Sequence, residues 1–172
     1  RDNKHTHVPP RKNAAAFLRS HFGYDIINSA RLFGDWKAGD KQMEDKKRCF
    51  WVRADNALYC AYHDEEWGTP IYDDREMYGL FFLELFQAGL SWITLLKKRE
   101  AFSEAFDGFD VEKIAQYDQA KIDELLQNAG IIRSRGKIEA AIANAKIVLA
   151  LKREFGSFCN YLWSFSAGKV VL

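Results

Sequence analysis

Apolar positions along the chain recur mainly at helical spacing, every three or four residues, and this pattern predicts an all-α fold. No segment of convincing length alternates apolar and polar positions as a half-buried strand does, and no internal repeat is evident. Helices are expected over 13–31 with a break at Gly23, over 73–89, over 91–106, over two short stretches within 109–130, over 134–156 and over 158–165.

Capping residues support these boundaries, because short polar side chains favour helix starts and glycine favours helix ends. The expected caps are Asp73 or Asp74 and Gly89 for the helix at 73–89, Ser91 for the helix at 91–106, and Asp110 and Asp118 for the two short helices. The composition of the sequence changes near Cys49, where aromatic residues become frequent. We therefore expect an N-terminal extension of unknown role at 1–46 that is partly helical, a helical domain at 47–166, and a tail at 167–172.

Composition is that of an ordinary globular protein, with 172 residues, 48% hydrophobic and 28% charged. No apolar run approaches the roughly 20 residues of a membrane span, and no secretory signal is recognisable at the N-terminus. Cys49, Cys60 and Cys159 are too few and too scattered for a disulfide scaffold, which indicates a cytoplasmic setting. Cys60 and Cys159 are expected to be small core residues.

Charge is unevenly distributed, although the net charge is only +1. Between Asn128 and Arg153 six basic residues stand against the single acid Glu139, and 15% of the chain is aromatic. A local basic stripe with surplus aromatic residues suits a protein that stacks on flat, charged ligands. The alternative is a well-filled core with a solvated helix face, and a solvated face is also expected for residues 97–99.

The segment 122–146 contains a helix end, a turn with glycine, two isoleucines, a basic stretch and a second helix. Glycine permits backbone conformations closed to other residues, so backbone N–H groups of such a hairpin could approach a phosphate. A helix-hairpin-helix of this kind grips DNA without reading its sequence. The alternative is a plain glycine-capped helix turn. The candidate DNA-binding residues are Gly130, Arg133, Arg135, Gly136 and Lys137.

One carboxylate, Glu84, interrupts the apolar run at 80–92. A buried charge is costly unless a partner uses it, so Glu84 is either a protonated or hydrogen-bonded core residue or part of a binding site. Aromatic residues are dense at 59–67, where Tyr59 and Tyr62 lie three apart and share a face of a helical turn. Packing is the alternative reading of each aromatic residue.

Four segments in this order and at this spacing resemble the 3-methyladenine DNA glycosylase I family. They are "RCFWV", "LYCAYHDEEWGTP", "QAGLSWITLLKKRE" and "NAGIIRSRGKI". The resemblance runs from about Lys47 to Phe165, roughly two thirds of the chain.

The resemblance implies a helix-hairpin-helix enzyme of base-excision repair, which flips an alkylated adenine out of DNA and hydrolyses its N-glycosidic bond. By the same resemblance, Glu84 and Tyr62 hydrogen-bond the flipped base, Trp92 stacks on it, and Tyr59 and Trp67 line the pocket. The implied partners are double-stranded DNA that contains alkylated adenine and free 3-methyladenine as product, with the protein acting as a monomer.

N3-methylation leaves positive charge on the adenine, so the leaving group is already activated, and a carboxylate and an indole face both attract a cation. The segment 148–165 contains no aspartate, only Glu154, which fits attack by water with limited base assistance. Glu84 could instead polarise that water. The alternative functions are a non-catalytic DNA-binding or damage-sensing module with the same fold, and an all-α interaction domain unrelated to nucleic acid.

The resemblance also implies a structural zinc held by two Cys/His pairs. One pair matches Cys49 and His63, whereas the second follows a segment matching Trp163–Phe165 and has no counterpart before Leu172. A closed zinc site needs four ligands, so two are unassigned.

Overall fold

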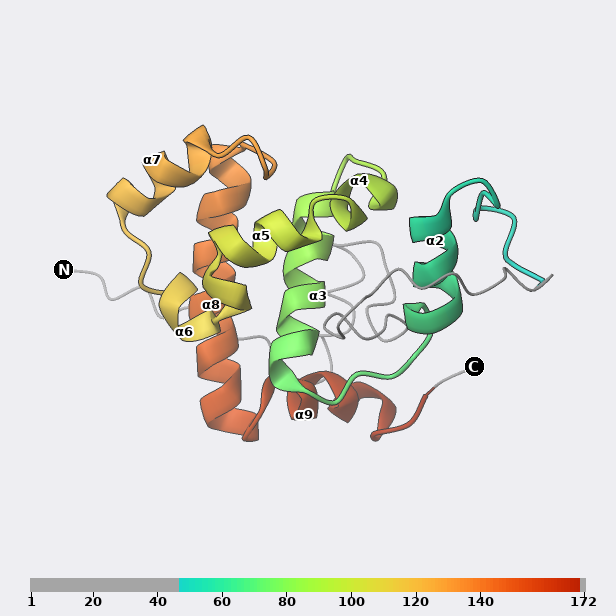
Figure 1. The fold of residues 1–172 in the computed structure, drawn as a ribbon. Coiled ribbons are helices and arrows are strands. Elements are labelled where there is room, and N and C mark those ends of the chain that lie inside the picture. Colours follow the sequence, from blue (N-terminus) through green and yellow to red (C-terminus); the bar gives the residue numbers. More distant parts are fainter. Residues whose placement is uncertain (1–46, 171–172) are drawn as a thin grey trace.

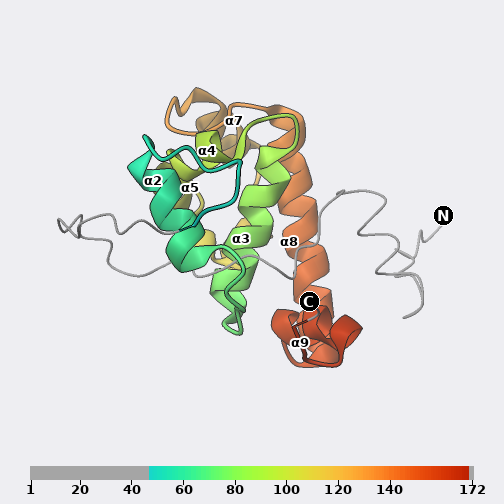
Figure 2. The same cartoon turned by 90° about the vertical axis from the view of Figure 1, so that its right-hand side faces the viewer.

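Two long helices, α3 (Asp74–Gln87) and α8 (Arg135–Phe155), lie side by side in the middle of the structure (Figures 1 and 2). The structure is a computed structural model that describes residues 47–170. The shorter helices are α2 (Ala57–Ala61), α4 (Trp92–Leu96), α5 (Arg99–Ala105), α6 (Val111–Ile114), α7 (Gln119–Gln127) and α9 (Phe158–Trp163). Single turns are the π-helix η2 (Tyr62–Glu66) and the 3₁₀ helices η3 (Asp107–Phe109) and η4 (Ser164–Ser166). Residues 47–170 contain no strand, so the predicted all-α class is confirmed.

Helix α3 is central because it is apolar on almost every side, which is typical of a helix enclosed by others. Its buried residues run from Met77 to Leu83 without a gap and include Phe86. Phe82 lies 4.6 Å from Phe106 between ring centroids, and Phe86 lies 4.8 Å from Phe102. These ring pairs join α3 to α5 and to Phe106, the residue directly after α5, and they belong to the core.

The predicted caps are largely confirmed. Asp73 accepts hydrogen bonds from the backbone N–H groups of the first turn of α3, and Asp110 and Asp118 do the same for α6 and α7. Gly89 follows the end of α3 with φ of +80°, a conformation that glycine adopts at little cost. Ser91 precedes α4, but its Oγ lies 2.7 Å from Oγ1 of Thr94 and caps no backbone N–H.

The prediction of one helix over 91–106 is wrong, because α4 and α5 are separate helices. The chain breaks at Lys97 and Lys98. Lys98 precedes α5 as its N-cap residue, and its ammonium donates to the carbonyl oxygens of Ala129 (3.1 Å) and Gly130 (2.9 Å). The break thus coincides with a tertiary contact between this lysine-rich stretch and the residues 129–130.

The predicted helix-hairpin-helix is present as α7, a turn at 128–134, and α8. Ile131 is buried and anchors the turn in the core. The conformational role expected of the two glycines is wrong, because neither Gly130 nor Gly136 has a positive φ. A Cβ at Gly130 would lie 3.0 Å from the Ala101 side chain, so close packing requires glycine there, whereas Gly136 lies within α8 beside open space.

Helix α9 is held against the start of α3 by a hydrogen-bonded carboxylate. Asp74 accepts from the backbone N–H groups of Phe158 (3.1 Å) and Cys159 (2.9 Å), and Nζ of Lys152 lies 3.5 Å from it. Cys60 and Cys159 are buried, as expected of core cysteines. The helix expected at 13–31 and the rest of the extension at 1–46 lie outside the described residues. Within residues 47–170 no helix is long and apolar enough to cross a membrane.

Candidate functional site

Aromatic rings gather where α2, η2 and α4 meet. Tyr59 stacks on Tyr62 with centroids 6.4 Å apart, and Tyr62 lies 5.6 Å from Trp92. Trp51 lies 5.2 Å from Tyr59 and 5.4 Å from Trp67. We call these five residues the aromatic cluster; four of them are the substrate-binding residues expected from the sequence.

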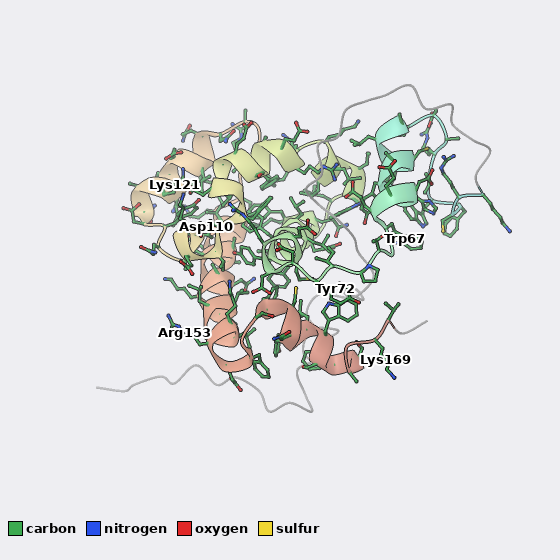
Figure 3. The ribbon with its side chains drawn as sticks, turned by 60° about the horizontal axis from the view of Figure 1, so that its bottom comes forward. Trp67, Tyr72, Asp110, Lys121, Arg153 and Lys169 are labelled. Atoms are coloured by element: carbon green, nitrogen blue, oxygen red, sulfur yellow. The ribbon has the colours of Figure 1, made fainter. Side chains whose placement is uncertain are left out.

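The π-helix η2 sets the directions of the aromatic residues that follow α2. The backbone N–H of Trp67 donates to the carbonyl of Tyr62 at 2.8 Å, which is the wide i to i+5 bond of a π turn. Such turns are rare and occur frequently at functional sites. Trp67 directly follows η2 (Figure 3), and 42% of its surface is exposed.

Glu84 lies on α3 and is partly buried, where the sequence left open either a core position or a place in a binding site. Burial raises its pKa from 4.5 to about 7. Among residues 47–170 no side chain or backbone group forms a hydrogen bond or ion pair with its carboxylate. A desolvated carboxylate without a protein partner is typical of a ligand-binding position.

Trp92 begins α4, eight residues after Glu84 in the sequence, and its indole N–H also has no partner within residues 47–170; the buried hydroxyl of Tyr78 in the core shares this property. Its Nε1–H is buried and forms no hydrogen bond within the described part of the chain. A buried N–H without an acceptor costs about 1–3 kcal/mol, so such a group gains from a ligand that accepts a hydrogen bond.

An ion pair joins η2, which precedes Trp67, to the first residue of α5. Nη1 of Arg99 donates to both carboxylate oxygens of Glu66, at 2.8 and 2.9 Å, and both side chains are mostly buried. Burial raises the pKa of Glu66, and Arg99 opposes that shift. Residues 97–99 were expected to form a solvated face, and this is wrong for Lys98 and Arg99.

The five candidate DNA-binding residues have different environments. Arg133 is exposed and forms no hydrogen bond or ion pair within residues 47–170, and Gly136 adjoins open space. Arg135 donates to Asp123 at 2.7 Å. Nζ of Lys137 donates to the carbonyl oxygens of Phe86 and Ala88, both at 2.6 Å. Arg133 and Gly136 are therefore the most open of the five, since Gly130 is closely packed.

A groove of about 470 Å³ lies beside the aromatic cluster. Tyr59 forms part of its wall, and two cations, Arg53 and Lys97, line it; Arg53 is paired with Asp55 at 2.7 Å. The other lining residues are Asp55, Asn56, Ala57 and Ile93. The groove thus provides a partly cationic surface next to the rings.

Cys49 and His63 lie close together, as the resemblance implied. Nε2 of His63 accepts from the backbone N–H of Cys49 at 3.4 Å, and its Nδ1 lies 3.0 Å from Asp64, which also pairs with Arg48. A carboxylate on one ring nitrogen is the usual way of orienting a histidine ligand. Residues 47–170 contain no group of three or more potential ligands, so they supply two of the four that a closed zinc site needs.

Sequence reasoning did not single out Trp51, although it contacts Tyr59, His63 and Trp67. It also did not assign the link between Arg99 and Glu66. The signal for Trp51 was present, because this residue lies inside the segment "RCFWV" that carries the resemblance. A long-range ion pair has no comparable signature in a single sequence.

Comparisons with known proteins agree with this geometry. The family model for methyladenine glycosylase matches residues 51–172. DNA-3-methyladenine glycosylase of Haemophilus influenzae is 46% identical over 125 residues, which are 73% of this chain and 67% of that protein. DNA-3-methyladenine glycosylase 1 of Escherichia coli is 47% identical over 119 residues, 69% of this chain and 63% of that protein.

Solved structures give the same result. A crystal structure of 3-methyladenine DNA glycosylase I has a TM-score of 0.68 and 49% identity, covering 72% of this chain and 67% of that one. The enzyme from Staphylococcus aureus, whose structure concerns 3-methyladenine recognition, has a TM-score of 0.65 and 43% identity over 66% of this chain and 61% of that one. The chain thus spans about two thirds of the length of the proteins it matches. It belongs to the methyladenine glycosylase family.

Proposed function

We propose that this protein is a DNA glycosylase of base-excision repair, which hydrolyses the N-glycosidic bond of 3-methyladenine in alkylated DNA after flipping the base out of the helix. The observation that carries the proposal is Glu84, a partly buried carboxylate without a protein partner, on the helix that leads to Trp92. The family match and the relatives named for this activity support it.

Recognition rests on charge and stacking. Ionised Glu84 accepts hydrogen bonds from the adenine edge and attracts the positive charge that N3-methylation adds. The electron-rich faces of Tyr62 and Trp92 favour the same cation over a neutral base. A base pair weakened by alkylation also costs less to open.

Bond cleavage needs little from the protein, because the cationic base is a good leaving group. The bond between the sugar C1′ and the base nitrogen breaks, its electron pair neutralises the departing base, and water adds to C1′ with loss of a proton. The products are free 3-methyladenine and an abasic site. The carboxylate of Glu84 either holds the base or polarises that water.

DNA is proposed to bind across the hairpin, through phosphates near Arg133, Arg135 and Gly136, with the groove beside Tyr59 available to the strand next to the flipped base. Such binding depends strongly on salt. We propose that the protein acts as a monomer. A structural zinc is also proposed, with Cys49 and His63 as one ligand pair; their proximity supports it.

The test is release of 3-methyladenine from alkylated duplex DNA by the unmodified chain, by Glu84→Gln and by Glu104→Gln. Glu104 is an exposed glutamate of α5 and serves as the matched control. Glu84→Gln should lower the single-turnover rate by about 10²-fold or more, the usual scale of an electrostatic contact in the transition state, while DNA binding survives. Glu104→Gln should release base normally.

Absence of release by the unmodified chain, with DNA still bound, would favour the damage-sensing module. Absence of salt-dependent DNA binding would favour an interaction domain unrelated to nucleic acid.

A further inference from the structure

Lys137 is a basic residue of the hairpin whose ammonium group binds two carbonyl oxygens of the protein itself. It lies in the first turn of α8, and its ammonium donates to the carbonyl oxygens of Phe86 and Ala88, both at 2.6 Å. Phe86 is in the last turn of α3, and Ala88 follows that helix directly. The last carbonyls of a helix have no partner within the helix, and a cation there is favourable because the helix dipole is negative at this end.

The capped helix end leads into the loop at 88–91, which joins the two groups that the proposed function uses. Glu84 lies one turn before the end of α3, and Trp92 is the first residue of α4. Inside the loop Gln87 closes a local ring, because its Nε2 donates to the Leu90 carbonyl at 2.7 Å. The Lys137 ammonium links the start of this loop to the hairpin through hydrogen bonds.

The hairpin is tied to the rest of the site at a second point. Lys98 holds the carbonyl oxygens of Ala129 and Gly130, and the next residue in the chain, Arg99, holds Glu66 in the π turn that follows Tyr59. The hairpin is therefore connected to the loop at 88–91 through Lys137. It is also connected, through Lys98 and Arg99, to the π turn η2 that lies between Tyr59 and Trp67. Arg133 differs, since it is exposed and forms no such connection within the described residues.

We infer that Lys137 is a positioning residue, which transmits the placement of the DNA-bound hairpin to the loop at 88–91 and so fixes Glu84 relative to Trp92, rather than a phosphate contact. This inference rests on the proposed function, because it concerns the rate of base release. It replaces the DNA-binding role expected from the sequence. A misplacement of about 1 Å far from the reacting atoms can cost up to 10²-fold in rate, so one side-chain link is sufficient to matter.

The test compares Lys137→Met with Arg133→Met and with Lys146→Met, an exposed lysine on the same helix. Each replacement keeps a long apolar stem and removes the charge. For Lys137→Met we expect the single-turnover rate at saturating DNA to fall by about 10-fold to 100-fold, with an unchanged salt slope for undamaged DNA. For Arg133→Met we expect the magnitude of the salt slope to fall by about 1. Lys146→Met should change neither quantity, and Lys137→Arg, which keeps hydrogen-bond donors, should recover most of the rate.

A reduced salt slope in Lys137→Met, like that of Arg133→Met, would overturn the inference, and so would an unchanged rate. If Lys137→Met does not fold, Lys137→Gln, which keeps one donor, is judged by the same two quantities. If the unmodified chain releases no base, the proposed function has failed, and hydrogen exchange of the amides at 88–91 decides the remaining claim. Faster exchange of these amides in Lys137→Met than in Lys146→Met supports the link between Lys137 and the loop. Equal exchange in the two variants overturns it.

Discussion

Glu84 connects the stability of the fold to its proposed chemistry, because the same burial that prepares it for a cationic base makes its ionised form costly. The pKa of Glu84 is about 7 in the folded protein, whereas the ordinary pKa of a glutamate, which applies to the unfolded chain, is 4.5. Between these two values the folded state binds more protons than the unfolded state, so the free energy of unfolding falls as pH rises from about 4.5 to about 7.

Glu84→Gln should therefore stabilise the protein above pH 7 and change its stability little at pH 4. We expect a gain of about 1–2 kcal/mol at pH 8, less than the full pKa shift would give because Glu84 retains some contact with water. The measurement is chemical denaturation of both proteins from pH 4 to 8. A difference in stability that does not depend on pH would show that Glu84 ionises normally. Gain of stability with loss of activity is the usual relation at a functional site.

At the scale of elements, the two glycines of the helix-hairpin-helix have different surroundings: one is closely packed and the other borders open space. Gly130 is enclosed, with the Ala101 side chain and Oδ1 of Asn128 each 3.0 Å from the position of a Cβ. Its N–H donates to that same Asn128 oxygen at 2.8 Å. Gly136 lies inside α8, where no heavy atom is within 4 Å of such a Cβ.

Alanine at these two positions should change stability in opposite directions. Gly130→Ala should destabilise by about 1–3 kcal/mol, because the added methyl forces Asn128 or Ala101 to move. Gly136→Ala should stabilise by about 0.5–1 kcal/mol through helix propensity, and it should weaken DNA binding if a phosphate uses the open space. Thermal unfolding and DNA titration of both variants check this. Equal destabilisation would mean that Gly136 is also enclosed.

The elements were largely predictable from the sequence, because apolar spacing and capping side chains act over one or two turns. Asp73, Asp110 and Asp118 start helices where the sequence placed them. The break between α4 and α5 was not predicted; it coincides with the contact of Lys98 with the hairpin, which joins residues 31 and 32 positions apart and has no signature in the local pattern.

The same limit applies to the site. Tyr59, Tyr62 and Trp92 lie together as the sequence suggested, and the family segments identified them. The contacts of Arg99 with a carboxylate and of Lys137 with two carbonyl oxygens were not predicted. A single sequence does not distinguish a basic side chain that binds another part of the protein from one that binds a phosphate. Whether the candidate residues contact DNA stays a prediction.

At the scale of the whole molecule, Asp74 joins three helices. It belongs to the first turn of α3, caps α9 through two backbone N–H groups and faces Lys152 of α8. Burial opposes its ionisation, but the N–H groups of Cys159 and Phe158 and the Lys152 ammonium outweigh burial and hold the pKa of Asp74 below its ordinary value. Its contribution is therefore complete above about pH 5 and is lost as pH falls through the ordinary pKa of 3.8 toward the lower pKa of the folded protein.

Asp74→Ala should destabilise the protein by about 1–3 kcal/mol at pH 7, because it leaves two N–H groups without an acceptor, and by less at pH 3. Asp55→Ala removes an exposed ion pair with Arg53 and is the matched control, with little effect expected. Urea denaturation at the two pH values measures both. A loss that is the same at pH 3 and pH 7 would show that the charge of Asp74 contributes nothing.

The π turn at Tyr62–Glu66 has a consequence for how sequences of this kind can vary in length. A π turn holds one more residue than an α turn, so deletion of one residue between 62 and 66 would restore the ordinary helix. Each residue of an α-helix adds about 100° of rotation, but a π turn takes up its extra residue within about one turn, so such a deletion would shorten the turn and leave the direction of Trp67 relative to Tyr59 nearly unchanged. The turn is therefore a place where the chain can differ in length by one residue while the aromatic residues on either side of it keep their directions.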